Sequence, residues 1–167
     1  MLRLGLAVAA LVALLDQASK LALLRHFGET GCVGHQQHIT GFLDLVLTCN
    51  RGVSFGMLNR TGVSSLVFAV AAAVIVIVLA VWLSRVQLRL LAIAIGLIIG
   101  GALGNAVDRV RLGAVVDFLY FHAGSWYWPA FNLADSAICL GVAAMLLDGL
   151  LLRRSTPQAK GREDLSS

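Results

Sequence analysis

Four long apolar stretches, separated by more polar segments, dominate the chain. A membrane-spanning helix needs about 20 predominantly apolar residues, and each stretch approaches that length. The stretches are Leu4–Leu24, Leu66–Leu83, Leu90–Val107 and Ala134–Leu152. The second contains no charged residue, so we expect it to lie mostly against lipid. The pattern predicts an all-α membrane protein, a four-transmembrane-helix bundle.

Two longer segments join these spans at one end of the predicted bundle. The first, 25–63, contains the stretch 39–48, whose partial alternation and β-branched residues predict short strands resting on the bilayer. The second, 110–133, is rich in aromatic residues of the kind that favour the membrane–water boundary. We therefore expect a small extracytoplasmic β-element beside the bundle.

The composition excludes an ordinary soluble domain. The 167 residues are 59% hydrophobic and only 13% charged, and the mean hydropathy is +0.86, whereas soluble domains have about 25% charged residues. We expect one membrane-embedded domain, 1–154, followed by a polar, disordered cytoplasmic tail, 155–167. The net charge of +4 comes without a basic stripe with interleaved aromatics, so it indicates anionic lipid and membrane topology, not nucleic acid.

Positive charges are denser around the chain ends and the short connection near residue 87 than in the two longer segments. Cytoplasmic segments of membrane proteins carry an excess of Lys and Arg. The bias therefore predicts that both termini are cytoplasmic and that 25–63 and 110–133 face outward. The basic residues on the predicted inner side are Arg3, Arg85, Arg89, Arg153, Arg154, Lys160 and Arg162.

The three cysteines show no C-x-x-C spacing, which argues against a zinc knuckle or a thioredoxin-type motif. Cys139 falls within an apolar run, so we expect a small core residue. Cys32 and Cys49 share one segment and can pair if it is extracytoplasmic. Two free thiols are the alternative.

Ionisable residues within a membrane span are costly and therefore indicate function by default. Asp16 and Lys20 are four residues apart on one helix face, and the simplest interpretation is a structural ion pair. In the third span, Gly96, Gly100 and Gly104 form a small-xxx-small pattern that lets two helices approach closely.

A polar group follows directly at the end of the third span. Asn105, Asp108 and Arg109 stand at positions i, i+3 and i+4, so they share one helix face. Capping and salt-bridge chemistry would account for all three.

Two further aspartates, Asp117 and Asp135, stand in apolar surroundings near the outer ends of spans. The structural alternatives are a helix-capping or first-turn acid for Asp135, and a partner of Arg109 or Arg111 for Asp117. The helices that end near Asp108 and begin near Asp135 are consecutive and antiparallel, so both acids can meet at one depth. Two nearby carboxylates cannot both ionise easily, and the proton they share is what aspartic peptidases use to activate water. Such a reaction needs no metal or organic cofactor.

Other chemistries fit the sequence less well. There is no H-E-x-x-H pattern, and no serine is placed with a histidine at membrane depth. Asp148 lies close to Arg153 and Arg154 and is expected to be an interfacial anion. A small proton-coupled transporter is the alternative function, but it would need acids near mid-bilayer and usually a repeat, and neither is visible.

The chain resembles the bacterial lipoprotein signal peptidases, or type II signal peptidases. Five motifs carry this resemblance in combination, in order and at the ends of the four spans. They are Asp16-Gln17-Ala18-Ser19-Lys20, Asn50-Arg51-Gly52-Val53-Ser54-Phe55-Gly56, the stretch 101–109 ending in Asn105-Ala106-Val107-Asp108-Arg109, Val116-Asp117-Phe118, and the stretch 129–136 containing Asn132 and Asp135.

The resemblance implies an intramembrane aspartic endopeptidase of the bacterial inner membrane, with its active site near the periplasmic face. It would remove the signal peptide of a prolipoprotein by cleaving just before the diacylglyceryl-modified cysteine, and globomycin-type inhibitors would act on it. Asp117 and Asp135 would be catalytic, and Asp16, Lys20 and Asp108 would support the site. The residues that would bind substrate and order the site are Asn50, Gly52, Asn105, Arg109 and Asn132.

Overall fold

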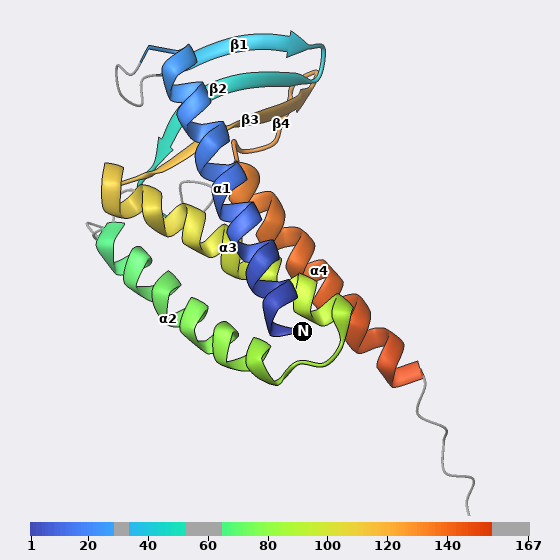
Figure 1. The fold of residues 1–167 in the computed structure, drawn as a ribbon. Helices are drawn as coiled ribbons and strands as arrows, with labels where there is room; N and C mark the ends of the chain where they lie inside the picture. Colours follow the sequence, from blue (N-terminus) through green and yellow to red (C-terminus); the bar gives the residue numbers. More distant parts are fainter. Residues whose placement is uncertain (29–33, 53–64, 155–167) are drawn as a thin grey trace, which may run out of the picture.

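The structure, a computed structural model, describes residues 1–28, 34–52 and 65–154, without the side chains of 151–154. Four long helices and a small sheet make up this part of the chain (Figure 1). The helices are α1 (Leu2–His26), α2 (Ser65–Arg85), α3 (Arg89–Leu112) and α4 (Leu133–Arg154). The strands are β1 (His35–Thr40), β2 (Leu43–Asn50), β3 (Val115–Ala123) and β4 (Trp126–Tyr127).

The predicted fold class is confirmed. All four helices are long and apolar enough to cross a membrane, and each predicted span lies within one of them. Helix α2 buries only Ala69 and Leu83, and most of its other apolar side chains are exposed. This agrees with the expectation that α2 lies mostly against lipid, because outward-facing apolar residues are stable only in an apolar solvent.

Helix α3 forms the centre of the bundle and packs against α1, α2 and α4. Its glycines allow this close packing. A Cβ atom at Gly96 would lie 2.5 Å from the backbone oxygen of Gly5, and one at Gly100 would lie 2.6 Å from that of Ala9. Both partners belong to α1, so the predicted small-xxx-small stripe is the α1–α3 interface.

The four strands form one antiparallel sheet in the order β1-β2-β3-β4. The sheet lies at one end of the bundle, whereas the N-terminus, the α2–α3 connection and the end of α4 lie at the other (Figure 1). The strands predicted within 39–48 are therefore confirmed as parts of β1 and β2. The extracytoplasmic location of the sheet stays a prediction.

Strand β3 was not expected from the sequence, where 110–133 was interpreted only as an aromatic-rich interfacial segment. Helix α3 ends at Gly113, whose φ of 71° gives the left-handed C-cap that glycine favours. The chain then enters β3, whose first four residues are all buried because the strand contacts α1 and α3 and pairs with β2. A strand buried on both faces lacks the polar–apolar alternation that would reveal it.

The expectation for Cys139 is wrong. It is a free, exposed cysteine on α4, because an apolar run in a membrane helix has a lipid-facing side as well as a core side. Cys32 lies outside the described residues, so its pairing with Cys49 stays a prediction. The tail 155–167, which the sequence predicts to be disordered, also lies outside the described residues.

Candidate active site

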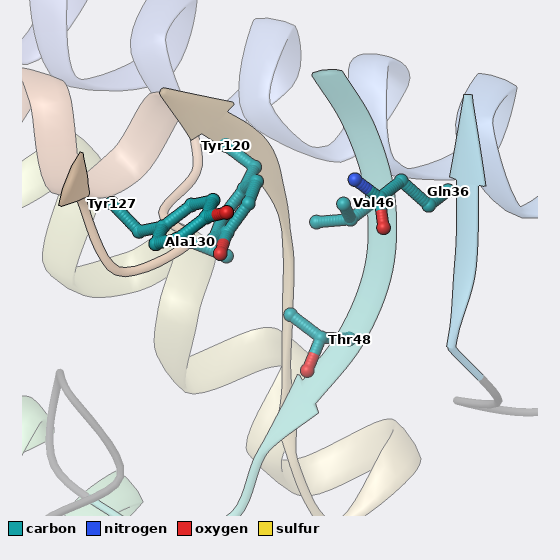
Figure 2. Close-up of a pocket in the computed structure, with 6 residues that line it drawn as sticks. All are labelled: Gln36, Val46, Thr48, Tyr120, Tyr127 and Ala130. Carbon is teal, nitrogen blue, oxygen red and sulfur yellow. The ribbon is translucent and has the colours of Figure 1, made fainter. Parts of the chain in front are cut away.

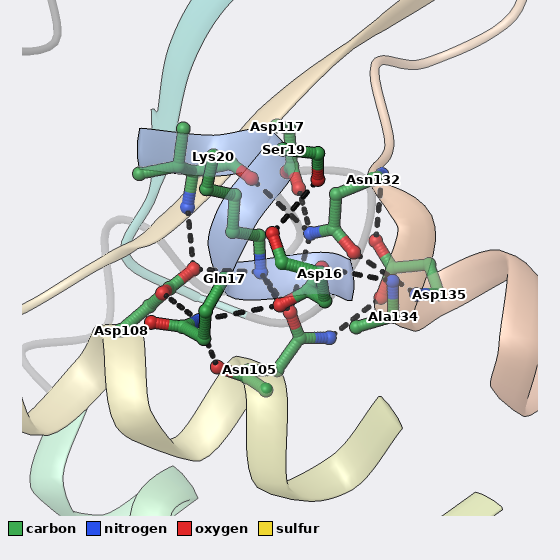
Figure 3. A network of polar contacts seen from close by, with 12 residues as sticks. Asp16, Gln17, Ser19, Lys20, Asn105, Asp108, Asp117, Asn132, Ala134 and Asp135 are labelled. Atoms are coloured by element: carbon green, nitrogen blue, oxygen red, sulfur yellow. Dashed lines mark hydrogen bonds and ion pairs between the residues drawn. The ribbon is translucent and has the colours of Figure 1, made fainter. Parts of the chain in front are cut away.

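Two aspartates, which we call the acid pair, meet where the sheet joins the bundle (Figure 3). Asp117 lies on β3 and is 3% exposed, and Asp135 is half-buried in the first turn of α4. Asn132, directly before α4, lies between them. Its Nδ2 donates to Asp117 Oδ1 at 2.7 Å, and its Oδ1 accepts from the backbone N–H of Asp135 at 3.0 Å.

Asn132 and Asp135 also cap α4. In addition to the Asp135 N–H bond, the backbone N–H of Asn132 donates to Asp135 Oδ2 at 3.4 Å. The two bonds form a reciprocal capping arrangement at the N-terminus of the helix. Asp135 therefore does act as a capping acid in the first turn of α4. The same capping bonds hold its carboxylate beside Asn132 and Asp117.

A second amide, Asn105 on α3, connects the acid pair to a buried lysine. Asn105 Nδ2 donates to Asp135 Oδ1 at 2.8 Å. Its Oδ1 accepts from Lys20 Nζ at 3.1 Å and from Asn132 Nδ2 at 3.2 Å. Each carboxylate of the pair thus receives a side-chain amide hydrogen bond, and the amide bound to Asp135 is oriented by a fixed charge.

Lys20 stands between two buried carboxylates, and the three residues Asp16, Lys20 and Asp108 are called the support cluster here. Lys20 Nζ lies 2.8 Å from Asp16 Oδ2 and 2.7 Å from Asp108 Oδ2. The side chains are 0%, 3% and 3% exposed for Asp16, Lys20 and Asp108, respectively. The predicted Asp16–Lys20 pair is confirmed, and Asp108 forms its ion pair with Lys20 across the α1–α3 interface.

The support cluster also holds the backbone next to each acid. Asp16 Oδ1 accepts the backbone N–H of Ala134 at 3.0 Å, one residue before Asp135. Asp108 Oδ2 accepts the backbone N–H of Val116 at 3.2 Å, one residue before Asp117. The two carboxylates joined by Lys20 therefore fix the two chain segments from which the acid pair projects.

Gln17 is a further member of this network, and no role was predicted for it. Its Nε2 donates to Asp108 Oδ1 at 2.8 Å and to the backbone oxygen of Gly104 at 3.1 Å. The signal for this role was the position of Gln17, a side-chain amide within a predicted span. Polar groups at membrane depth need hydrogen-bond partners. Its backbone partner Gly104 is close to α1, since a Cβ there would lie 2.5 Å from Asp16 Oδ2.

The electrostatics of the site favour the protonated form of Asp117. Burial, and next the negative charge of Asp135, raise the pKa of Asp117 to about 7. Hydrogen bonds from Asn132 and Asn50 oppose this rise by stabilising the ionised carboxylate. Asp117 is therefore close to half protonated near neutral pH, as an acid beside a second carboxylate should be.

Arg109 lies beside the acid pair but bonds to backbone oxygens. Its Nη1 donates to Asn105 at 3.2 Å, its Nη2 donates to Gly52 at 3.3 Å, and the guanidinium carbon lies 5.7 Å from the centre of the Phe68 ring. Among the described residues, no group accepts a hydrogen bond from its buried Nε. The interpretation of Asp117 as a salt-bridge partner of Arg109 or Arg111 is not supported by the ion pairs of the described residues.

Two cavities border the site. One, of about 320 Å³, reaches Asp135 and is lined by Trp128, Ala130, Phe131, Asp135, Ser136, Ile138 and Cys139. The other, of about 470 Å³, lies across the strands, with Tyr120 and Tyr127 on one side and Gln36 and Val46 on the other (Figure 2). Thr48 and Ala130 complete its lining. The two cavities share Ala130 as a lining residue.

Comparison with known proteins decides the family. The model of the signal peptidase (SPase) II family matches residues 8–151. The chain belongs to this family. It is 50% identical to a lipoprotein signal peptidase of Nitrobacter hamburgensis, covering 92% of this chain and 93% of that protein. It is 46% identical to one of Methylorubrum extorquens, covering 87% and 82%.

The fold comparison agrees with this membership. A solved bacterial membrane enzyme superposes with a TM-score of 0.75 at 28% identity, covering 94% of this chain and 93% of that structure. The chain is therefore a multi-pass membrane peptidase. A transporter, the alternative that the intramembrane acids left open, is set aside because the family consists of peptidases.

The structure brings most of the expected site residues together. Asn105, Asn132 and Asn50 each contact one of the acids. Gly52 is buried, and its N–H donates to Asn50 Oδ1 at 3.1 Å. The rest of that motif, 53–56, lies outside the described residues.

Proposed function

We propose that this membrane signal peptidase is an aspartic endopeptidase that removes the signal peptides of prolipoproteins, with Asp117 and Asp135 as its catalytic residues. The observation that carries the proposal is the pair itself. Two carboxylates from different elements are bridged by Asn132, and one of them has a pKa of about 7. Such a pair can supply an acid and a base at the same pH.

The mechanism follows from the different environments of the two acids. Asp117 is the more buried acid, so the shared proton resides preferentially on it, and Asp135 acts as the base. The ionised carboxylate takes a proton from water, whose oxygen attacks the scissile carbonyl carbon while the protonated acid donates to the carbonyl oxygen. Collapse of the tetrahedral intermediate breaks the C–N bond, the proton on the base passes to the leaving amine, and one hydroxyl proton of the intermediate returns to the acid that protonated the carbonyl oxygen.

The surrounding polar groups orient the substrate and the acids. Asn105 and Asn132 hold the carboxylates by hydrogen bonds, which limits the reorganisation needed in the transition state. Arg109 and Asn50 stand beside the acid pair. A globomycin-type inhibitor is expected to occupy this same site.

The lipid of the precursor positions the scissile bond relative to the acid pair. Each buried CH₂ contributes about 0.8 kcal/mol to membrane binding, so a two-chain lipid anchors the peptide far more strongly than a short segment can. Cleavage just before the diacylglyceryl-modified cysteine places the scissile bond next to that anchor. The cavity beside Asp135, lined mostly by apolar residues, is suited to the boundary between the peptide and its lipid.

The topology is part of the proposal. Both termini are cytoplasmic, and the sheet and acid pair lie near the periplasmic face of the bacterial inner membrane, as the positive charges at the other end favour. Reporter fusions at Gln158 should therefore read as cytoplasmic. A periplasmic signal at that position would overturn the orientation.

The decisive experiment incubates the purified protein with one precursor in two forms, with and without the diacylglyceryl group on its cysteine. Only the lipidated form should be cleaved efficiently, and Asp117→Asn and Asp135→Asn should each abolish cleavage in a folded protein. Asp148→Asn on α4 is the matched control and should retain most activity. Near-normal turnover by Asp135→Asn would refute the aspartic mechanism, and equal rates for the two precursors would refute the lipid requirement.

A further inference from the structure

A second cluster of chemically capable side chains lies on the sheet, away from the acid pair. It consists of His38 on β1, Asp44 on β2 and His122 on β3. Asp44 is paired with Tyr120 in the β2–β3 register, whereas Asp117 is paired with Thr48, further along the strands. The peptidase mechanism uses none of the three residues.

The three side chains converge on one carboxylate oxygen. His38 Nδ1 lies 2.8 Å and His122 Nε2 lies 3.3 Å from Asp44 Oδ1. One ligand-type atom from each residue falls within 4.8 Å of the other two. Two imidazoles and a carboxylate, from three neighbouring strands, are thus gathered into a space that one ion could fill.

Asp44 is held for this role by its surroundings. The residue is 1% exposed, and its second oxygen accepts a hydrogen bond from Gln36 Nε2 at 2.6 Å. A hydrogen bond of this kind orients a metal-ligating carboxylate and leaves its other oxygen for the ion. The His38 side chain, 78% exposed, and the His122 side chain, 18% exposed, leave an open approach from solvent.

We propose that His38, Asp44 and His122 bind a divalent transition-metal ion, Zn²⁺ fitting best, with water as the fourth ligand. Imidazole nitrogen and carboxylate oxygen both suit Zn²⁺, and three protein ligands plus water is a common tetrahedral arrangement. The proposal is independent of the peptidase function.

The two separations from Asp44 Oδ1 need little adjustment. Zinc bonds to nitrogen and oxygen are about 2.0–2.2 Å long, so two ligands at a tetrahedral angle stand about 3.3 Å apart. His122 already has that separation from Asp44, and His38 has to withdraw by about 0.5 Å, which its exposure permits. Each imidazole then coordinates the ion through the ring nitrogen that now faces Asp44. The proton on that nitrogen moves to the other ring nitrogen or is released.

Binding would connect three strands through side chains. The bound ion would tie β1 to β3 across β2, in addition to the backbone ladder. Because only the folded sheet presents all three ligands, zinc should raise the melting temperature of the protein in a concentration-dependent way.

The test titrates full-length protein without a histidine tag, in detergent, with ZnCl₂ against a chromophoric zinc indicator. One ion per chain is expected, and His38→Asn should weaken binding by at least about tenfold, because loss of even an outer-shell partner costs that much. His35→Asn is the matched control, since His35 is an exposed histidine on the same strand outside the cluster. It should bind zinc as the unsubstituted protein does.

Two further measurements keep the result unambiguous. Each variant is compared with its own melting curve without metal, and only His38→Asn should lose the zinc-dependent rise in melting temperature. Asp117→Asn should bind zinc normally, which separates this site from the acid pair. Equal zinc affinity for the two histidine variants, or no stoichiometric binding, would show a hydrogen-bonded network only and overturn the proposal.

Discussion

Replacing Lys20 by Met tests the support cluster most directly. The methionine keeps the length of the side chain but removes the ammonium group that lies 2.8 Å from Asp16 and 2.7 Å from Asp108. Removing one partner of a buried ion pair typically costs about 3–5 kcal/mol, because the remaining charge stays buried without compensation. Here two carboxylates lose their shared cation. We therefore expect a loss at the upper part of that range, against a total stability of about 5–15 kcal/mol for typical domains.

Unfolding in mixed micelles of mild detergent and dodecyl sulfate, followed by tryptophan fluorescence, would measure this loss. Arg3→Met is the matched control on the same helix, because Arg3 is exposed and surface substitutions usually stay within about 0.5 kcal/mol. Adding Asp108→Asn to Lys20→Met should restore at least about 1 kcal/mol by removing one uncompensated charge. A loss below about 1 kcal/mol for Lys20→Met would refute the reasoning.

Three further predictions follow from the geometry. Because the pKa of Asp117 is raised to about 7, the acid pair should lose its shared proton above that pH, and cleavage should fall by about tenfold per pH unit on the alkaline side of a bell-shaped profile. Gly100→Ala should destabilise the bundle, whereas Gly149→Ala, with open space around its Cβ, should be neutral or stabilising by up to about 1 kcal/mol. Thiol titration of unreduced, denatured protein should give one free thiol if Cys32 and Cys49 are paired, and three would refute the pairing.

The bundle could be predicted because its physical signal is local. Span length and hydropathy follow directly from bilayer thickness, and the Asp16–Lys20 pair follows from the four-residue spacing along one helix. The glycine repeat likewise predicted a close helix contact, and α1 is that partner. Each of these inferences needs only one helix and the solvent around it.

The tertiary part of the site could not be predicted in the same way. Asp108 was grouped with Asn105 and Arg109 because the three share a helix face, yet its partners Lys20 and Gln17 come from α1. No spacing within one helix records a contact between two helices. Similarly, Asp117 was expected near the end of a span, and it lies in a strand that is too buried to show alternation.

The support cluster is better explained by positioning than by stability. A buried ion pair often contributes no more stability than well-packed apolar residues of the same volume, so three charges between α1 and α3 need another reason. That reason is where their remaining oxygens point: Asp16 binds the N–H of Ala134, and Asp108 binds the N–H of Val116. Each acid of the pair therefore follows a residue whose backbone is held by a buried carboxylate, and Lys20 connects the two. Because one acid comes from a strand and the other from a helix, such a cross-connection fixes their positions relative to each other.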